Sequence, residues 1–170
     1  MNVITKKINM SFKIILLTLT LIINNPLINE TRELFIKGAE DKRAAEKLME
    51  LTSKNQSDPL MKAYYAMSYA LIAKHSWNPY RKFENVKISL KLLNESIQSE
   101  QYNIESRFLR FCLEDNIPSF FPFKSHIEDD KQFILKNLKT NHPLYPNILS
   151  YLKKAKHLNV TDKNELNRFN

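Results

Sequence analysis

The stretch Arg81–Ser99 reads RKFENVKISLKLLNESIQS and has the clearest periodicity in the chain. Its apolar residues recur every three or four positions, at Phe83, Val86, Leu90, Leu93 and Ile97. This spacing draws a single apolar stripe along one face of an α-helix. The stretch therefore predicts an amphipathic helix that packs its stripe into a core.

Start signals divide the rest of the chain into further helices. Asp58 followed by Pro59 marks a helix start, because aspartate caps the first backbone N–H groups and proline fits the first turn. The helix that follows, to about His75, is apolar almost all round, which indicates a central position. Further helices are expected near 29–39, 41–53 with Asp41 as cap, 103–115, from 125 with a Ser125–Glu128 capping box, and 145–157.

The scarcity of glycine excludes several other folds. Gly38 is the only glycine in 170 residues. Hairpin turns and phosphate-binding loops depend on glycine, and no dinucleotide or Walker motif is present. The sequence therefore predicts an all-α fold of six or seven helices that pack as antiparallel hairpins, since the connections are short.

A repeat pattern adds detail to this prediction. The spacing of Ser89, Leu93 and Ser96 matches the second helix of a tetratricopeptide repeat, and Tyr64 and Tyr65 loosely match its first helix. No repeat of about 34 residues recurs cleanly. We expect a tetratricopeptide-like array.

The N-terminus has the pattern of a targeting segment. Lys6, Lys7 and Lys13 precede the apolar run Ile14–Ile23. A run of about ten residues fits the core of a signal peptide, whereas a membrane span needs about twenty. A buried helix of the fold is the third interpretation of this run. We expect export to the periplasm, the cell envelope or the medium.

These signals divide the chain into three parts. Residues 1–28 are predicted to be a signal peptide or, because no pair of small residues marks a cleavage site, an uncleaved membrane anchor. Residues 29–158 are predicted to form the helical domain. Residues 159–170 are expected to be a tail that is frayed or disordered.

Charge and cysteine content exclude other classes. The formal net charge is +8, but the basic residues are interspersed with acids, so no nucleic-acid partner is expected. Cys112 is the only cysteine, which excludes an intrachain disulfide, and it is expected to be a buried, inert thiol. None of the four histidines has a zinc-site spacing, and we expect no metal and no cofactor.

Three groups of residues carry a resemblance to a known group of proteins. They are Lys74-His75-x-x-Asn78-Pro79, Arg107-Phe108-Leu109-Arg110-Phe111 with Asn116-x-Pro118-x-Phe120, and Asp129-Asp130-Lys131 with Ile134-Leu135-x-Asn137-Leu138. Over Leu34–Leu138 the chain resembles uncharacterised exported helical proteins of Bacteroidetes-type bacteria. The resemblance implies an envelope or secreted location and a helical fold. It implies no activity.

Two arginines form one candidate site. Arg107 and Arg110 lie three positions apart, so they share a helix face and could grip a carboxylate or phosphate. The alternative is ion pairing with an acid on a neighbouring helix, for which Glu84, Glu95 and Asp129 are the candidates. An anion-binding site would require one deep pocket that gathers both arginines with His75 and an acid, and Lys74 could join the same patch.

The loop 117–125, IPSFFPFKS, forms a second candidate site. Phe120, Phe121 and Phe123 lie between two prolines. Such aromatic side chains either cover a core or present an adhesive surface to a partner or membrane.

These features leave three functional hypotheses open. The leading one is a non-catalytic helical module of the cell envelope that binds a protein or peptide in a groove. The second is an enzyme or a binder of small anions that uses the arginine face, although no catalytic motif is present. The third is attachment to a membrane surface through the uncleaved N-terminal segment, the only membrane-inserting part, and through the phenylalanine loop.

Overall fold

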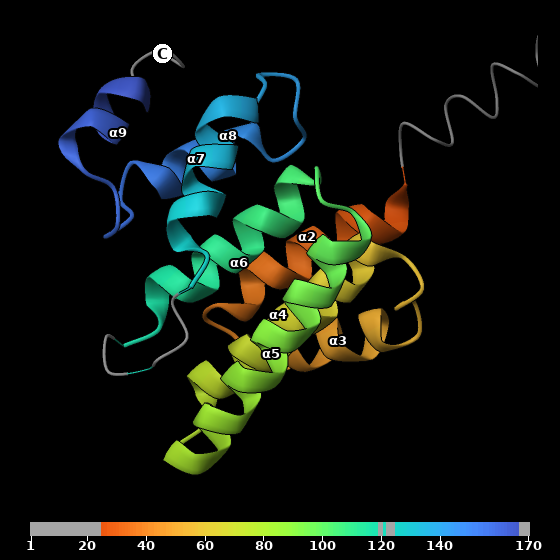
Figure 1. The fold of residues 1–170 in the computed structure, drawn as a ribbon. Coiled ribbons are helices and arrows are strands. Elements are labelled where there is room, and N and C mark those ends of the chain that lie inside the picture. The colour runs from red at the N-terminus through yellow and green to blue at the C-terminus, as the bar shows by residue number, and fades with distance from the viewer. Residues whose placement is uncertain (1–24, 119–120, 122–124, 167–170) are drawn as a thin grey trace, which may run out of the picture.

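Eight α-helices and no strand are formed by the residues that the structure describes, which are 25–118, 121 and 125–166 in a computed structural model (Figure 1). This confirms the all-α prediction. The helices are α2 (Pro26–Gly38), α3 (Lys42–Ser53), α4 (Pro59–His75), α5 (Pro79–Ser99), α6 (Ile104–Asn116), α7 (Ile127–Asn137), α8 (Tyr145–Leu152) and α9 (Val160–Leu166).

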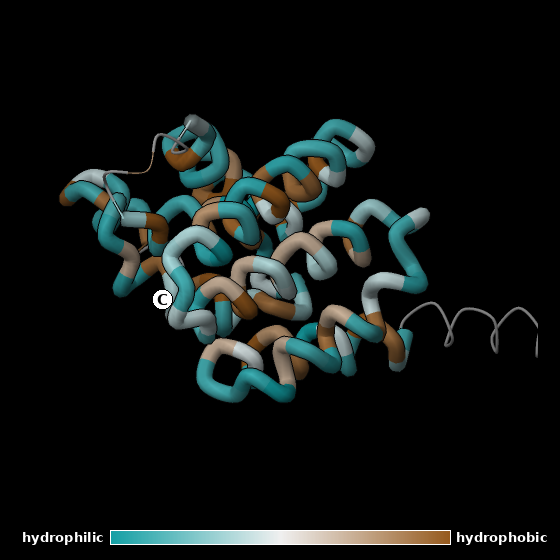
Figure 2. The backbone as a smooth tube through the Cα atoms, turned by 90° about the horizontal axis from the view of Figure 1, so that it is seen from below, coloured by the Kyte–Doolittle hydropathy of each residue, from teal (hydrophilic) through white to brown (hydrophobic). Residues whose placement is uncertain are grey.

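Consecutive helices pack against one another from α2 to α5, and α6 packs against α7. Only Ser76–Asn78 join α4 to α5, so these two helices form an antiparallel hairpin. The central position predicted for α4 is confirmed, because it contacts α2, α3, α5 and α6. Helix α4 is apolar almost all round, whereas most of the other helices carry hydrophobic and hydrophilic residues on different faces (Figure 2).

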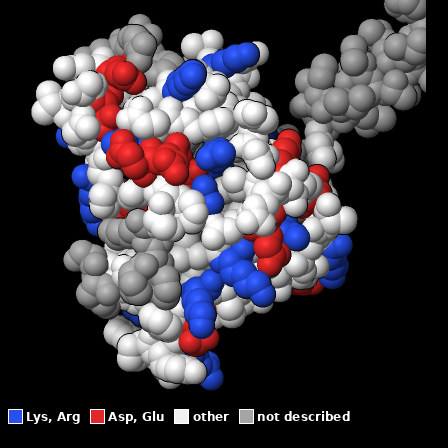
Figure 3. Space-filling model, viewed as in Figure 1, with Lys and Arg blue, Asp and Glu red and all other residues white. Residues whose placement is uncertain are grey.

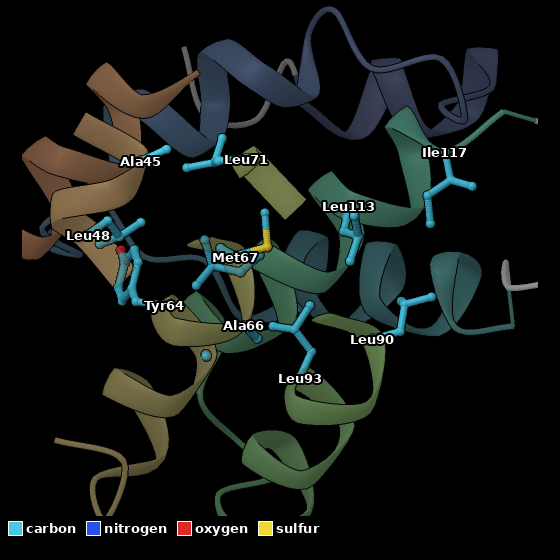
Figure 4. Packing of buried hydrophobic residues seen from close by; sticks show 12 residues of the cluster. Ala45, Leu48, Tyr64, Ala66, Met67, Leu71, Leu90, Leu93, Leu113 and Ile117 are labelled. Atoms are coloured by element: carbon cyan, nitrogen blue, oxygen red, sulfur yellow. The ribbon is translucent and has the colours of Figure 1, made fainter. Parts of the chain in front are cut away.

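Two clusters of buried apolar side chains form the core. The first cluster lies among α3, α4 and α5 and receives Leu109 and Leu113 from one face of α6 (Figure 4). The second lies among α7, α8 and α9 and receives Phe108 and Phe111 from the other face of α6. Helix α6 therefore joins two halves of the molecule.

The stripe predicted on α5 is confirmed at most of its positions. Leu90, Leu93 and Ile97 are buried, and Val86 is half-buried. Phe83 differs, since its side chain remains exposed near the start of the helix. The stripe therefore meets the core along its C-terminal three turns and leaves the core toward its first turn.

Side chains cap the starts of five of the described helices, α2 to α6. The Asp58 carboxylate accepts from the backbone N–H groups of Leu60 and Met61 at 2.8 and 3.0 Å, as predicted. Asp41 caps α3 in the same way, and Asn103 caps α6. These starts depend on residues next to the helix in the sequence.

The capping box predicted at Ser125 does not form. Helix α7 begins two residues later, and the Ser125 hydroxyl lies 2.8 Å from Nδ1 of His126 instead. The backbone N–H of His126 donates to Glu114 of α6 at 3.0 Å. A carboxylate that is distant in the sequence thus holds the start of α7.

The C-terminal part also differs from the prediction. Helix α8 ends at Leu152, before the predicted end at 157, because the backbone N–H groups of Lys156 and His157 donate to Asp115 of α6 at 3.1 and 3.2 Å. The tail predicted to be frayed or disordered contains α9, whose Leu166 is buried in the second cluster.

At the other end, α2 begins at Pro26, inside the predicted targeting segment. Asn25 caps it by accepting from the N–H groups of Leu27 and Ile28 at 3.1 and 3.4 Å. The rest of that segment, residues 1–24, lies outside the described residues. Within the described ranges, no helix has both the length and the apolar character needed to cross a membrane.

Candidate functional site

The two predicted arginines meet on one buried carboxylate. Arg110 donates through Nε and Nη2 to the two oxygens of Asp130, at 2.7 and 2.8 Å. Arg107 donates through Nη1 to the same carboxylate at 3.0 Å and lies 4.3 Å from the ring centre of Phe133. Asp130 is fully buried. The alternative of ion pairing is therefore correct, but the acid is Asp130 rather than any of the three candidates.

This arrangement leaves little donor capacity for an anionic ligand. The third guanidinium nitrogen of Arg110 donates to Asn94 of α5 at 2.7 Å, and Nε of Arg107 donates to the carbonyl of Gln101 at 2.8 Å. The arginines line only a small depression of about 240 Å³. Through these hydrogen bonds the two arginines hold α6 against α5 and α7.

Lys74 and His75 lie elsewhere, at the end of α4. Nε2 of His75 donates to the carbonyl of Gly38 at 2.8 Å, and the Lys74 ammonium donates to the carbonyl of Ala39 and to Glu40. Both side chains thus satisfy carbonyl groups at the end of α2. The predicted pocket that gathers His75 with the two arginines is wrong.

Each of three further buried acids on α6 has protein partners. Glu105 accepts two hydrogen bonds from Arg32 of α2, at 2.7 and 2.9 Å, and one from the Tyr64 hydroxyl of α4. Burial and the neighbouring Glu105 charge raise the pKa of Tyr64 well above its usual value. Glu114 and Asp115 hold α7 and the segment after α8, as described above. These acids act as structural acceptors between helices.

The thiol of Cys112 is buried in the second cluster, as predicted. Burial raises its pKa well above the usual value, which keeps it protonated and unreactive. Among the described residues, no group of three or more His, Cys, Asp or Glu side chains is placed to hold a metal ion.

An apolar cavity of about 610 Å³ lies between α4, α5 and the end of α6. Its size is typical of sites that bind small molecules or side chains. Most of its wall is hydrocarbon. The apolar lining residues are Ala70 and Ala73 of α4, Pro79, Phe83 and Val86 of α5, and Leu113, Ile117, Pro118 and Phe121 at and after α6.

The phenylalanine loop forms part of this cavity. Phe121 packs on Phe83 with ring centres 5.5 Å apart and also contacts the first core cluster. The interpretation of the loop as a core cover therefore holds for Phe121. Phe120 and Phe123 lie outside the described residues.

Three polar side chains complete the lining. Lys74 and Lys82 contribute ammonium groups, and Asn116 contributes an amide. Among the residues that the structure describes, no acid lines the cavity. The cavity thus joins a hydrocarbon wall to a cationic edge, and of the predicted site residues it brings together Lys74 and Phe121.

Comparison with models of known protein families, with curated proteins and with solved structures finds no match to this chain. The resemblance to exported Bacteroidetes-type proteins and the likeness to tetratricopeptide repeats therefore stay predictions.

Sequence reasoning missed most of the cavity. Val86 and Leu113 have the spacing of core residues, and nothing local distinguishes a core residue from one that lines a cavity. The exposed Phe83, one turn from Pro79, was the available signal. It lies on the core stripe but near the start of its helix, beside two cations.

Proposed function

We propose that this domain is a non-catalytic binding module whose apolar cavity holds apolar side chains of a protein or peptide partner. The observation that carries the proposal is the cavity of about 610 Å³ between α4, α5 and the end of α6. Open apolar cavities of this size are rare on soluble domains unless they bind something.

The charges around the cavity suggest the chemistry of the partner. Lys82 is exposed and forms no ion pair with a described residue, and the Lys74 ammonium is shared with Glu40. A partner segment with acidic residues beside its apolar ones complements this edge. The proposed ligand is therefore an apolar peptide segment flanked by Asp or Glu.

Labelled peptides with one apolar centre and either acidic or basic flanks provide the test, with fluorescence anisotropy as the measurement. The acid-flanked peptides should bind more tightly. Ala70→Leu fills the cavity from α4 and should weaken binding at least tenfold. Lys82→Glu should reverse the preference between the flanks, because it changes the sign of the charge at the edge.

Lys47→Glu is the matched control, since Lys47 is an exposed lysine of α3 that lines no described cavity. It should leave both affinities within twofold. Equal affinity for the two peptide sets, or unchanged binding by the Ala70→Leu variant, would refute the proposal.

For the location, we propose export to the cell envelope. The support is the basic and apolar N-terminal sequence that ends near residue 23. Mass spectrometry of the N-terminus of the protein recovered from cells tests this. A cut near residues 24–30 supports a signal peptide, and an intact N-terminus in the membrane fraction supports an anchor.

A further inference from the structure

An exposed aromatic and basic run lies at the turn between α4 and α5. All seven residues of Trp77–Phe83, WNPYRKF, are exposed. Trp77 is 99% exposed and Tyr80 is 71% exposed. Large aromatic side chains are normally buried at least in part. An almost fully solvent-exposed tryptophan beside a second exposed aromatic residue therefore indicates a contact surface.

The turn that carries these side chains is well ordered by its own hydrogen bonds. The Asn78 side chain accepts from the N–H groups of Tyr80 and Arg81, at 2.9 and 3.2 Å, and the Ser76 hydroxyl accepts from the N–H of Asn78 at 3.2 Å. Pro79 fixes the first turn of α5. The run is presented at the end of the α4–α5 hairpin, which projects from the molecule (Figure 1).

Positive charge surrounds the aromatic side chains. Arg81, Lys82 and Lys87 are exposed and form no ion pair with any described residue. Between residues 74 and 91 the only acid is Glu84. Lys and Arg side chains gather over the α4–α5 hairpin in the space-filling view (Figure 3).

We propose that the run Trp77–Phe83 docks the protein onto an anionic membrane surface. Tryptophan and tyrosine prefer the boundary between headgroups and acyl chains, because they combine an apolar ring with a polar group. Arginine and lysine beside them are attracted to anionic headgroups. A projecting end lets both kinds of side chain reach a flat surface at once.

The sequence predicted membrane contact through the N-terminal segment and the phenylalanine loop 117–125. The run Trp77–Phe83 belongs to neither segment, although Phe83 packs on Phe121 of the loop. The run shares Pro79, Lys82 and Phe83 with the lining of the proposed peptide site, but membrane docking goes beyond that site because it requires no occupant in the cavity. The two proposals fail independently, since one is tested with peptides and the other with vesicles.

Trp77 is the only tryptophan in the chain, so its fluorescence reports contact at this surface alone. The test adds vesicles to the full-length protein. One set contains phosphatidylcholine only, and the other also contains phosphatidylglycerol, with brominated acyl chains in both sets. With the anionic vesicles, the emission should move to shorter wavelength and be quenched by bromine. Membrane insertion by residues 14–23 alone would not produce this quenching.

The double variant Arg81→Gln/Lys82→Gln removes two positive charges from the run. The lipid concentration for half-maximal quenching should rise roughly thirtyfold, given the usual contribution of each cation near an anionic surface. The control Lys136→Gln/Lys139→Gln removes two exposed charges from the other half of the molecule and should have less than a threefold effect. Similarly, Tyr80→Ala should weaken quenching, whereas Tyr102→Ala, which also removes an exposed tyrosine, should not.

Three results would overturn the proposal. The first is an emission spectrum that anionic vesicles leave unchanged. The second is an equal effect of the two double variants, which would indicate attraction by overall charge only. The third is an emission that responds to the peptides of the binding test but not to vesicles, which would assign the run to a protein partner.

Discussion

Gly38 ends α2 at a point where no side chain fits well. A Cβ atom added there would lie 2.9 Å from Cδ1 of Leu71 and 3.2 Å from the backbone N and Cα of Ala45. The backbone φ of Gly38 is not positive, so the requirement for glycine comes from close packing rather than from conformation. The chain's one glycine therefore allows α2 to approach α3 and α4 closely.

Gly38→Ala should lower the free energy of unfolding by about 1–2 kcal/mol, measured by urea denaturation. Overpacking by one methyl group outweighs the gain of up to about 1 kcal/mol in helix propensity. The double variant Gly38→Ala/Leu71→Ala should cost less than the sum of the two single changes, because the shortened side chain makes room. A more stable Gly38→Ala protein would contradict the packing argument.

At the scale of the element, α9 depends on one buried ion pair. The Lys131 ammonium of α7 lies 2.8 Å from the Asp162 carboxylate. Burial by itself would raise the pKa of Asp162, but the hydrogen bonds from Lys131 and from the backbone of Asn159 outweigh burial and lower it. The ionised carboxylate therefore stabilises the attachment of α9 to α7.

Asp162→Asn should lower the free energy of unfolding by about 2–3 kcal/mol at neutral pH, because it leaves the Lys131 charge buried with weaker compensation. The pKa of Asp162 is lower in the folded protein than its unfolded value of about 3.9. The ionised carboxylate therefore contributes its full share to the free energy of unfolding above about pH 3.9. This stabilisation is lost as the pH falls through the folded pKa. Denaturation of both proteins between pH 7 and pH 2 measures this. The difference in the free energy of unfolding between the two proteins should shrink toward the acid end. The difference for Asp129→Asn, which changes an exposed acid of α7, should stay small throughout.

The helices also show which helix boundaries are determined by residues that are neighbours in the sequence. Asp41 and Asp58 mark the starts of α3 and α4, because the cap and the capped groups are neighbours in the sequence. The start of α7 and the end of α8 depend on Glu114 and Asp115, which no local pattern links to them. Helix α9 did have a local signal, since Asn159 and Asp162 accept hydrogen bonds from each other's N–H groups at 2.9 Å, as in a capping box.

The whole molecule consists of two cores that share α6. Leu109 and Leu113 belong to the first cluster, and Phe108 and Phe111 belong to the second. Because one helix fills both cores, the loss of either core removes the support of the other. We expect one cooperative unfolding transition rather than two.

The reactivity of the single thiol tests this. Leu48→Ala in the first cluster and Leu152→Ala in the second should each cost about 2–5 kcal/mol. Because Cys112 is buried in the second cluster, its labelling by a thiol reagent follows the opening of that cluster. If unfolding is cooperative, both variants should accelerate labelling by one to three orders of magnitude. A Leu48→Ala protein that labels at the original rate would show that the halves unfold separately.

The candidate site could be predicted less well than the fold. Amphipathic periodicity shows which residues leave water, but it does not separate Val86 and Ile117, which line a cavity, from residues that lie in a closed core. The arginine pair was recognised as one helix face, and an acid on a neighbouring helix was expected as its partner, but the three candidate acids did not include Asp130. Both the cavity and the identity of the acid depend on contacts between helices that are distant in the sequence.

The hydrogen bond between Nε2 of His75 and the carbonyl of Gly38 also fixes where the turn between α4 and α5 lies relative to α2. It places the end of α4, and with it Trp77, next to the C-terminal end of α2. Pro26 is at the opposite end of α2, about 20 Å away for a helix of 13 residues. Pro26 and the aromatic turn therefore lie toward opposite ends of α2, so a surface that meets the protein at Pro26 and a surface that meets it at Trp77 would lie on opposite sides of the molecule.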